Sequence, residues 1–140
     1  MFQLHEQLAR DCEPMGRFPL CQLLLVDDSN YPWFLLVPRR ERVCEIFDLS
    51  VTDRHELLSE SMLLAGWLAQ EFQADKLNIA TLGNQVAQLH VHYVVRYLDD
   101  VAWPNPVWGR VPARPYEAQE MEQMRRRVFA GALEGLREDL

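Results

Sequence analysis

The sequence is poor in cysteine. Its 140 residues include three cysteines, Cys12, Cys21 and Cys44, and no Cys-x-x-Cys pair. An odd number of cysteines without paired spacing favours neither a disulfide framework nor a zinc ribbon. Since a chain without structural disulfides is typical of a reducing compartment, we expect a cytoplasmic protein.

Basic residues and long apolar runs are also scarce. Fourteen Lys and Arg stand against 21 Asp and Glu, a formal net charge of −7. This balance argues against a protein that binds along the backbone of DNA or RNA, so a few local groups must hold any bound anion. No apolar run approaches the ~20 residues that span a bilayer, and the N-terminus lacks the pattern of a signal peptide. We therefore expect neither a nucleic-acid polymer nor a membrane as partner.

No internal repeat, low-complexity tract or linker interrupts the chain, and its length suits one domain. Hydrophobic residues make up 49% and charged residues 25%, as in ordinary globular proteins. We predict a single domain over residues 1–140, with its core at about 20–97 and a C-terminal part at 99–140.

The N-terminal third indicates a hairpin. Residues 1–11 could form a short helix in a lead-in segment, because Pro14 and Gly16 soon break the pattern. Two apolar runs, 21–26 and 33–37, then flank a polar cluster typical of a turn. Runs of strand length on both sides of a turn predict a β-hairpin.

The middle of the chain predicts one long buried helix and two further strands. Ser50 is a candidate N-cap, and helical spacing of apolar residues continues to near Asp75. The positions that carry this spacing are Leu57, Met62, Ala65, Leu68 and Phe72. Strand-like segments 77–82 and 89–97 follow, separated by the turn signal at Gly83.

The C-terminal part begins with a proline-rich segment, 99–115, that should be irregular. We expect its Trp103 and Trp108 to pack against the domain rather than to stack on a base. Apolar residues then recur at helical spacing over 121–136, which predicts an amphipathic helix. We expect its Arg125–Arg127 run to be solvated, as we do Arg39, Arg40 and Arg96.

The chemistry concentrates in one pentapeptide. Gln88, His90 and His92 lie two residues apart, which places all three side chains on one face of a strand. The alternate positions, which should face the core, are Leu89, Val91 and Tyr93. Since a buried imidazole needs a hydrogen-bonding partner, packing alone would not select this face. The pattern indicates a functional site.

Three interpretations of the histidine pair are open. A neutral imidazole can attack phosphorus while a neighbouring imidazole hydrogen-bonds the departing oxygen. His-x-His spacing can also supply two nitrogens to zinc, although His5, His55 and the cysteines add no helpful spacing for further ligands. Finally, the pair could be a hydrogen-bonded structural feature.

Residues 83–94, Gly-Asn-Gln-Val-Ala-Gln-Leu-His-Val-His-Tyr-Val, resemble the signature of the histidine triad (HIT) superfamily, in which a Gly-Gln-x-Val segment leads into His-x-His-x-His. Residues 32–39 are similar to that family's Gly-His-x-Leu-Val-x-Pro-Lys/Arg strand. The order of the two motifs and the helix between them also agree. Two ordered motifs make the resemblance more specific than His-x-His alone.

The resemblance implies an α+β domain with a five-stranded antiparallel sheet, one main helix and a C-terminal helix, paired as a homodimer. It implies a nucleotide-binding hydrolase or nucleotidyl transferase that cleaves a nucleotide conjugate, a phosphoramidate or a dinucleoside polyphosphate, at the α-phosphate. His90 corresponds to the family's nucleophile, which forms a nucleotidyl-histidine intermediate, and His92 to the histidine that assists the leaving group. No cofactor or metal is implied.

The resemblance also implies substrate-binding residues. Asn78 and Gln85 match the family's groups at phosphate or leaving group, and Asp27 or Asp28 matches the acid that holds the ribose hydroxyls. Each has an alternative interpretation, because amides and acids near turns commonly satisfy turn backbone.

Two positions depart from the family pattern. Gln88 replaces the first histidine of the triad and is the third residue that we assign to the catalytic group. Its amide can donate and accept a hydrogen bond, so it could still orient His90, but it cannot become cationic. Trp33 replaces the upstream histidine, and we expect it to cost the site a polar group and to narrow the pocket edge. The alternative function is therefore a nucleotide-binding or protein-interaction module that kept the fold and lost turnover.

Overall fold

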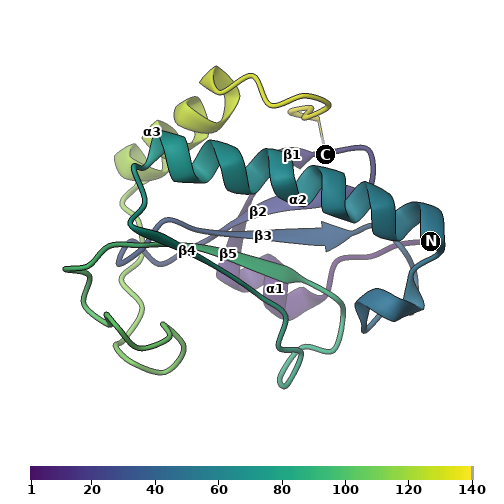
Figure 1. Cartoon of the computed structure of the whole chain (residues 1–140), viewed down its shortest axis with the longest axis horizontal. Coiled ribbons are helices and arrows are strands. Elements are labelled where there is room, and N and C mark those ends of the chain that lie inside the picture. The colour runs from purple at the N-terminus through teal and green to yellow at the C-terminus, as the bar shows by residue number, and fades with distance from the viewer. Residues whose placement is uncertain (140) are drawn as a thin grey trace.

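The computed structural model describes residues 1–139, which form an α+β fold (Figure 1). The strands are β1 (Cys12–Arg17), β2 (Cys21–Val26), β3 (Trp33–Pro38), β4 (Lys76–Ala80) and β5 (Val91–Arg96). The helices are α1 (Glu6–Asp11), α2 (Val51–Glu71) and α3 (Ala118–Ala130), with a 3₁₀ turn at Ile46–Asp48. All strand pairs are antiparallel in the order β1-β2-β3-β5-β4. The predicted fold class is confirmed.

Strand β1 is the element that residue patterns did not predict. It lies at one edge of the sheet, where Pro14 pairs with Leu24 and Gly16 with Leu23, so Met15 is the extra residue of a bulge. An edge position tolerates proline, and a bulge accepts glycine at positive φ, here +126°. Pro14 and Gly16, which interrupt the helical pattern in the sequence, therefore belong to a strand.

The predicted hairpin is present as β2 and β3, which pair from Cys21↔Pro38 to Leu25↔Phe34. Both strands are almost wholly buried, which explains why their sequences are continuous apolar runs.

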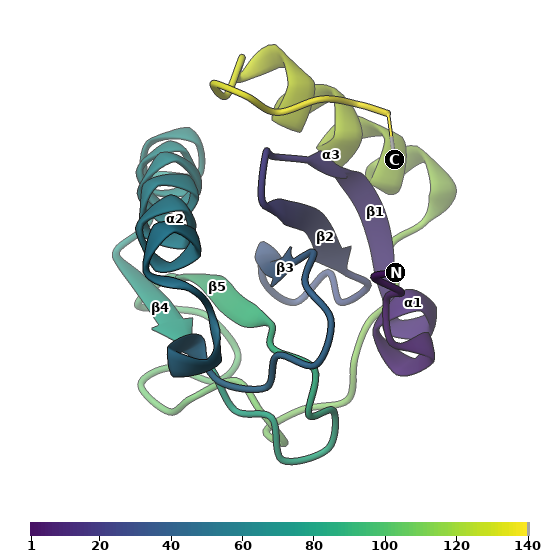
Figure 2. The same ribbon diagram turned by 90° about the vertical axis from the view of Figure 1, so that its right-hand side faces the viewer.

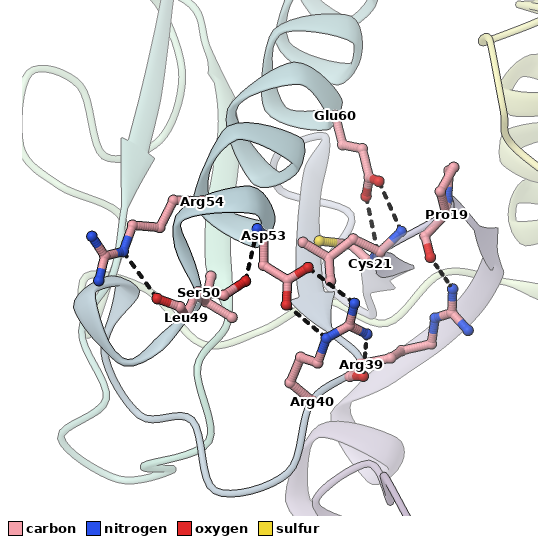
Figure 3. Close-up of polar contacts among 10 residues, drawn as sticks. Pro19, Cys21, Arg39, Arg40, Leu49, Ser50, Asp53, Arg54 and Glu60 are labelled. Carbon is pink, nitrogen blue, oxygen red and sulfur yellow. Dashed lines mark hydrogen bonds and ion pairs between the residues drawn. The ribbon is translucent and has the colours of Figure 1, made fainter.

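Helix α2 begins as predicted. The Ser50 hydroxyl accepts a hydrogen bond from the backbone N–H of Asp53 at 3.1 Å, while the Asp53 carboxylate pairs with Arg40 (Figure 3). The helix ends at Glu71, earlier than expected. Its buried face contains the carboxyl group of Glu60, whereas Met62, predicted to be buried, is 52% exposed.

The sheet separates two different environments (Figure 2). Helices α2 and α3 cover one face and enclose the main core, which includes Leu64 of α2, Val128 of α3 and Tyr93 of β5. The other face is covered by α1 and by loops, and Leu8 of α1 belongs to the same apolar cluster as Leu35 of β3. Because loops rather than long helices cover it, the second face has room for a cavity.

The C-terminal helix is shorter than its apolar spacing predicts. After α3 the chain turns at Ala132 and Gly135, which both have positive φ, and Leu133 and Leu136 pack on the core without helix. Beyond the turn, Arg137 bridges the edge strand β1 at Arg17. None of the helices within residues 1–139 is long and apolar enough to cross a membrane.

The Arg125–Arg127 run is less solvated than predicted. Arg125 pairs with Glu13 at 2.8 Å, and Arg127 pairs with Glu71 and lies over the ring of Phe72. These contacts attach α3 to β1 and to the end of α2.

Candidate functional site

The two histidines of the pentapeptide lie side by side on the loop-covered face of the sheet. His92 lies within β5, opposite Leu35 of β3 and Ala80 of β4. His90 precedes β5, so the strand begins two residues later than predicted. The ring centroids are 4.9 Å apart and both side chains are buried. The predicted shared face is therefore present for these two residues.

The alternate residues face the opposite side, as predicted. Leu89, Val91 and Tyr93 are all buried in the main core beneath α2. Because these side chains pack in the core, they fix the position of the backbone that carries His90 and His92.

Both imidazoles border a cavity of about 450 Å³. Its walls come from segments far apart in the sequence, including Leu8 of α1, Trp33 of β3 and Trp108 of the proline-rich segment. Gln85, which we expect to contact phosphate, also lines this cavity. The lead-in segment thus lines the cavity, a role that its mixture of apolar and charged residues did not indicate.

The ring of His90 is oriented by the main chain. Its Nδ1 lies 2.7 Å from the carbonyl oxygen of Gln88. A carbonyl oxygen can only accept, so Nδ1 carries the proton and the Nε2 lone pair of a neutral ring is left free. His90 therefore has the tautomer that a nucleophilic imidazole requires.

The ring of His92 is oriented by Trp33. The indole Nε1–H donates to His92 Nδ1 at 3.0 Å, and because an indole only donates, Nδ1 must be unprotonated. His92 Nε2 is buried and has no hydrogen-bond partner among the described residues. Burial, and then the neighbouring His90, lower the pKa of His92 to about 4. His92 is thus a neutral ring with an unused Nε2–H donor.

The side-chain amide of Gln88 forms its hydrogen bonds with the N-terminal segment and not with the two imidazoles. Its Oε1 accepts from the backbone N–H of His5 at 2.8 Å, and its Nε2 donates to the carbonyl of Gln3 at 2.9 Å. The expectation that the amide orients His90 is replaced by a different arrangement, in which the Gln88 carbonyl does so and the amide holds the N-terminal segment.

Asn78 lies apart from the histidine cavity. Its Oδ1 accepts from Arg96 at 2.8 Å, in a separate hollow that Trp103 also lines. Arg96, predicted to be solvated, is 1% exposed and pairs with Asp100 at 2.8 Å. The structure therefore does not bring Asn78 together with Gln85.

The two candidate ribose acids line an adjoining hollow that shares the walls Trp33 and Trp108 with the histidine cavity. Asp27 Oδ1 accepts from the backbone N–H of Tyr116 at 2.9 Å. Asp28 is buried, and its Oδ1 accepts from the backbone N–H groups of Asn30 and Arg114. Both acids thus anchor the C-terminal segment, and Asp28 also has the turn role that was its alternative interpretation.

Two tryptophans differ from expectation. Trp33 supplies a polar N–H to the site instead of costing it a polar group. Trp108, expected only to pack, lies edge-on to His92 with centroids 5.2 Å apart and lines the cavity.

Asp11, at the end of α1, is a further lining residue that the sequence did not predict. No local pattern distinguishes such residues, because only folding brings their segments to β5.

Within residues 1–139, no cluster of three or more His, Cys, Asp or Glu side chains is arranged to hold a metal ion. The arrangement instead offers one free imidazole lone pair and one free imidazole N–H at a cavity.

Several known proteins are similar to this chain in sequence and fold. A family model described as the HIT domain matches residues 8–99. A histidine triad protein from Marinobacter aquaeolei is 43% identical with a TM-score of 0.94, over 98% of this chain and 99% of that chain.

Two further solved structures are nearly as similar. Histidine triad proteins from Bradyrhizobium japonicum and Sinorhizobium meliloti are each 40% identical with TM-scores of 0.91. The first match covers 93% of this chain and 97% of that chain, and the second covers 94% and 97%. No curated protein matches the sequence. The family model and these structures, which agree with the paired imidazoles of His90 and His92, show that the chain belongs to the histidine triad (HIT) family.

Proposed function

We propose that the protein binds a nucleotide conjugate in the histidine cavity and cleaves it at the α-phosphate, with His90 as nucleophile. The observation that carries the proposal is the pair of Nδ1 contacts. Gln88 engages Nδ1 of His90 and Trp33 engages Nδ1 of His92, so both Nε2 atoms remain for a ligand. A buried N–H without a partner, as at His92, is rare unless a ligand completes it.

The first step is attack of the His90 Nε2 lone pair on the α-phosphorus. An N–P bond forms, the bond to the leaving group breaks, and its electron pair departs with that group. The imidazole then carries phosphorus on Nε2 and a proton on Nδ1, so it is cationic. The Gln88 carbonyl, 2.7 Å from Nδ1, stabilises this cation.

In the second step a water molecule attacks the same phosphorus. The N–P bond breaks, its electron pair returns to Nε2, and the nucleoside monophosphate leaves while one proton passes to solvent. Because His90 becomes neutral again with its proton on Nδ1, the starting tautomer is restored.

The remaining lining residues hold the substrate in this proposal. The Nε2–H of His92 donates to a phosphate oxygen, and the Gln85 amide lies at the same cavity. Asp27 and Asp28, in the adjoining hollow, are the candidates for the ribose hydroxyls. Neutral donors suit a chain whose net charge of −7 would otherwise repel a phosphate.

Replacement of the nucleophile tests the proposal. A panel of AMP conjugates is assayed for AMP release with the parent, His90→Ala and His55→Ala, in which His55 is an exposed histidine of α2. We expect His90→Ala to lose at least about a thousandfold in kcat, since covalent catalysis then has no nucleophile, and His55→Ala to match the parent. An alkaline quench followed by mass spectrometry should find the nucleotidyl group on His90.

Full turnover in His90→Ala would contradict the proposal. Calorimetric binding of AMP with no release above the His90→Ala background would instead support the alternative, a binding module. The homodimer that the resemblance implies stays a prediction, which light scattering of the purified protein can check.

A further inference from the structure

We propose that Trp33 is a positioning residue that holds His92 as a neutral Nε2–H donor, and that the cavity is thereby selective for conjugates whose leaving group departs as a stable anion. Phosphoanhydrides such as dinucleoside polyphosphates belong to this class, and phosphoramidates do not. The inference rests on the proposed function and narrows its substrate class.

The geometry leaves His92 a single hydrogen-bonding state. Trp33 Nε1 lies 3.0 Å from Nδ1, and an indole N–H cannot accept a hydrogen bond. A proton on Nδ1 would therefore face another N–H proton in a buried site. The positive end of the indole dipole disfavours the imidazolium for the same reason, and burial acts in the same direction.

The indole is itself held in place by aromatic neighbours. Tyr31 and Trp108 contact Trp33 edge-on, with centroids 6.2 Å and 5.8 Å away. Trp108 also stands edge-on to His92. These packed rings leave the indole little freedom to turn its N–H away from Nδ1.

The charged and titratable groups around His92 are few. His90 lies beside it, and the other titratable side chains among the described residues that line the cavity are the carboxylate of Asp11 and the thiol of Cys12. The residues paired with His92 on β3 and β4 are Leu35 and Ala80, which carry no charge. No acid of the sheet is therefore placed opposite His92 to stabilise an imidazolium.

The state of His92 limits which bond can break. When His90 attacks a phosphoanhydride, the departing oxygen takes its electron pair and leaves as a phosphate anion, which needs no proton. In a phosphoramidate the nitrogen must receive a proton as the P–N bond breaks, because an amide anion is too basic to depart. A neutral imidazole N–H can hydrogen-bond the leaving atom but cannot transfer that proton at neutral pH.

The ring nitrogens of His92 can be observed directly. In ¹⁵N NMR of the parent at neutral pH we expect His92 to show an unprotonated, hydrogen-bonded Nδ1 and a protonated Nε2. In Trp33→Phe the Nδ1 signal should shift, because its donor is lost. Tyr31→Phe is the matched control, since it changes a ring beside Trp33 that makes no bond to His92, and it should keep the parent signals.

Kinetics test the consequence with two probes that share the AMP group, diadenosine tetraphosphate and adenosine 5′-phosphoromorpholidate. The parent should prefer the tetraphosphate. In Trp33→Phe the morpholidate-to-tetraphosphate ratio of kcat/KM should rise by about tenfold or more. The smaller ring removes the donor at Nδ1 and leaves room for water there, which relieves part of the burial, so His92 can take up a proton and act as an acid. Tyr31→Phe should keep the parent ratio.

The two proposals fail separately. If the parent cleaves both probes equally well, His90→Ala abolishes both activities, and NMR shows His92 protonated on both nitrogens near neutral pH, the role of Trp33 is overturned and the proposed function stands. If the parent cleaves neither probe, the proposed function fails, and the substrate preference inferred from it fails as well. The NMR spectrum of the parent then still decides whether Trp33 sets the tautomer of His92.

Discussion

The amide of Gln88 connects the N-terminal segment to the histidine loop. Its two hydrogen bonds reach Gln3 and His5, and the His5 side chain in turn accepts from the backbone N–H of Gln7 at the start of α1. Helix α1 contributes Leu8 to the wall of the histidine cavity. The glutamine at this position thus links the site to the segment that covers it.

Loss of this amide should loosen the N-terminal segment. In Gln88→Ala we expect amide hydrogen exchange in residues 3–11 to accelerate by roughly fivefold, because two hydrogen bonds worth about 1 kcal/mol net are lost. Exchange in β5 should stay unchanged. Gln70→Ala, an exposed position of α2, is the control. Unchanged exchange in residues 3–11 of Gln88→Ala would show that other contacts hold the segment.

At the scale of elements, one buried carboxyl group joins α2 to the sheet. Glu60 is 1% exposed, and its two oxygens accept from the backbone N–H groups of Leu20 and Cys21, each at 2.8 Å (Figure 3). These N–H groups lie at the start of β2, where Cys21 is opposite Pro38, a residue without an N–H of its own. The helical apolar pattern does not reveal this contact, because Glu60 is an acid among core positions.

Removal of this carboxyl group should be costly. Glu60→Ala leaves two buried N–H groups without acceptors, so we expect the free energy of unfolding to fall by about 3 kcal/mol or more. Urea denaturation measures the change. The neighbouring exposed substitution Ser59→Ala should stay within about 0.5 kcal/mol of the parent. A loss below about 1 kcal/mol in Glu60→Ala would mean that water or a shifted side chain satisfies these groups.

At the scale of the whole molecule, two buried groups lie on opposite faces of the sheet and change the free energy of unfolding with pH in opposite directions. His92 has its pKa lowered from 6.5 to about 4 by burial and by His90. The unfolded chain therefore takes up this proton first as pH falls, and stability decreases from pH 6.5 toward 4, by up to about 3 kcal/mol. Burial raises the pKa of Glu60 above 4.5, so its contribution is greatest below pH 4.5 and is lost as pH rises.

Single substitutions should separate these two contributions. Between pH 6.5 and 4.5, His92→Asn should lose less stability on acidification than the parent, because the destabilising proton uptake is gone. Glu60→Gln should lose more, because the compensating group is gone. Urea denaturation at several pH values measures how the free energy of unfolding changes with pH in each variant, with His55→Ala as the control. Parallel slopes for the parent and His92→Asn would contradict a lowered pKa at His92.

Much of the fold could be predicted from local patterns. The apolar runs of β2 and β3 and the cap at Ser50 predicted their elements, because burial on both faces and helix capping leave direct traces in the sequence. Strand β1 was missed because the edge of a sheet tolerates Pro14 and Gly16. The last turns of the predicted C-terminal helix were wrong because Leu133 and Leu136 pack against the core, partly buried, without being helical.

For the site, the sequence by itself determined the paired imidazoles on one face, since the alternation at His90 and His92 is a local property of an extended chain. Only the tertiary structure decided their chemical states. The carbonyl that orients His90, the indole that orients His92 and the distant cavity walls such as Trp108 depend on contacts between separate segments. Tautomer and charge follow from those contacts, because a ring nitrogen that faces an acceptor carries the proton and a ring nitrogen that faces a donor does not.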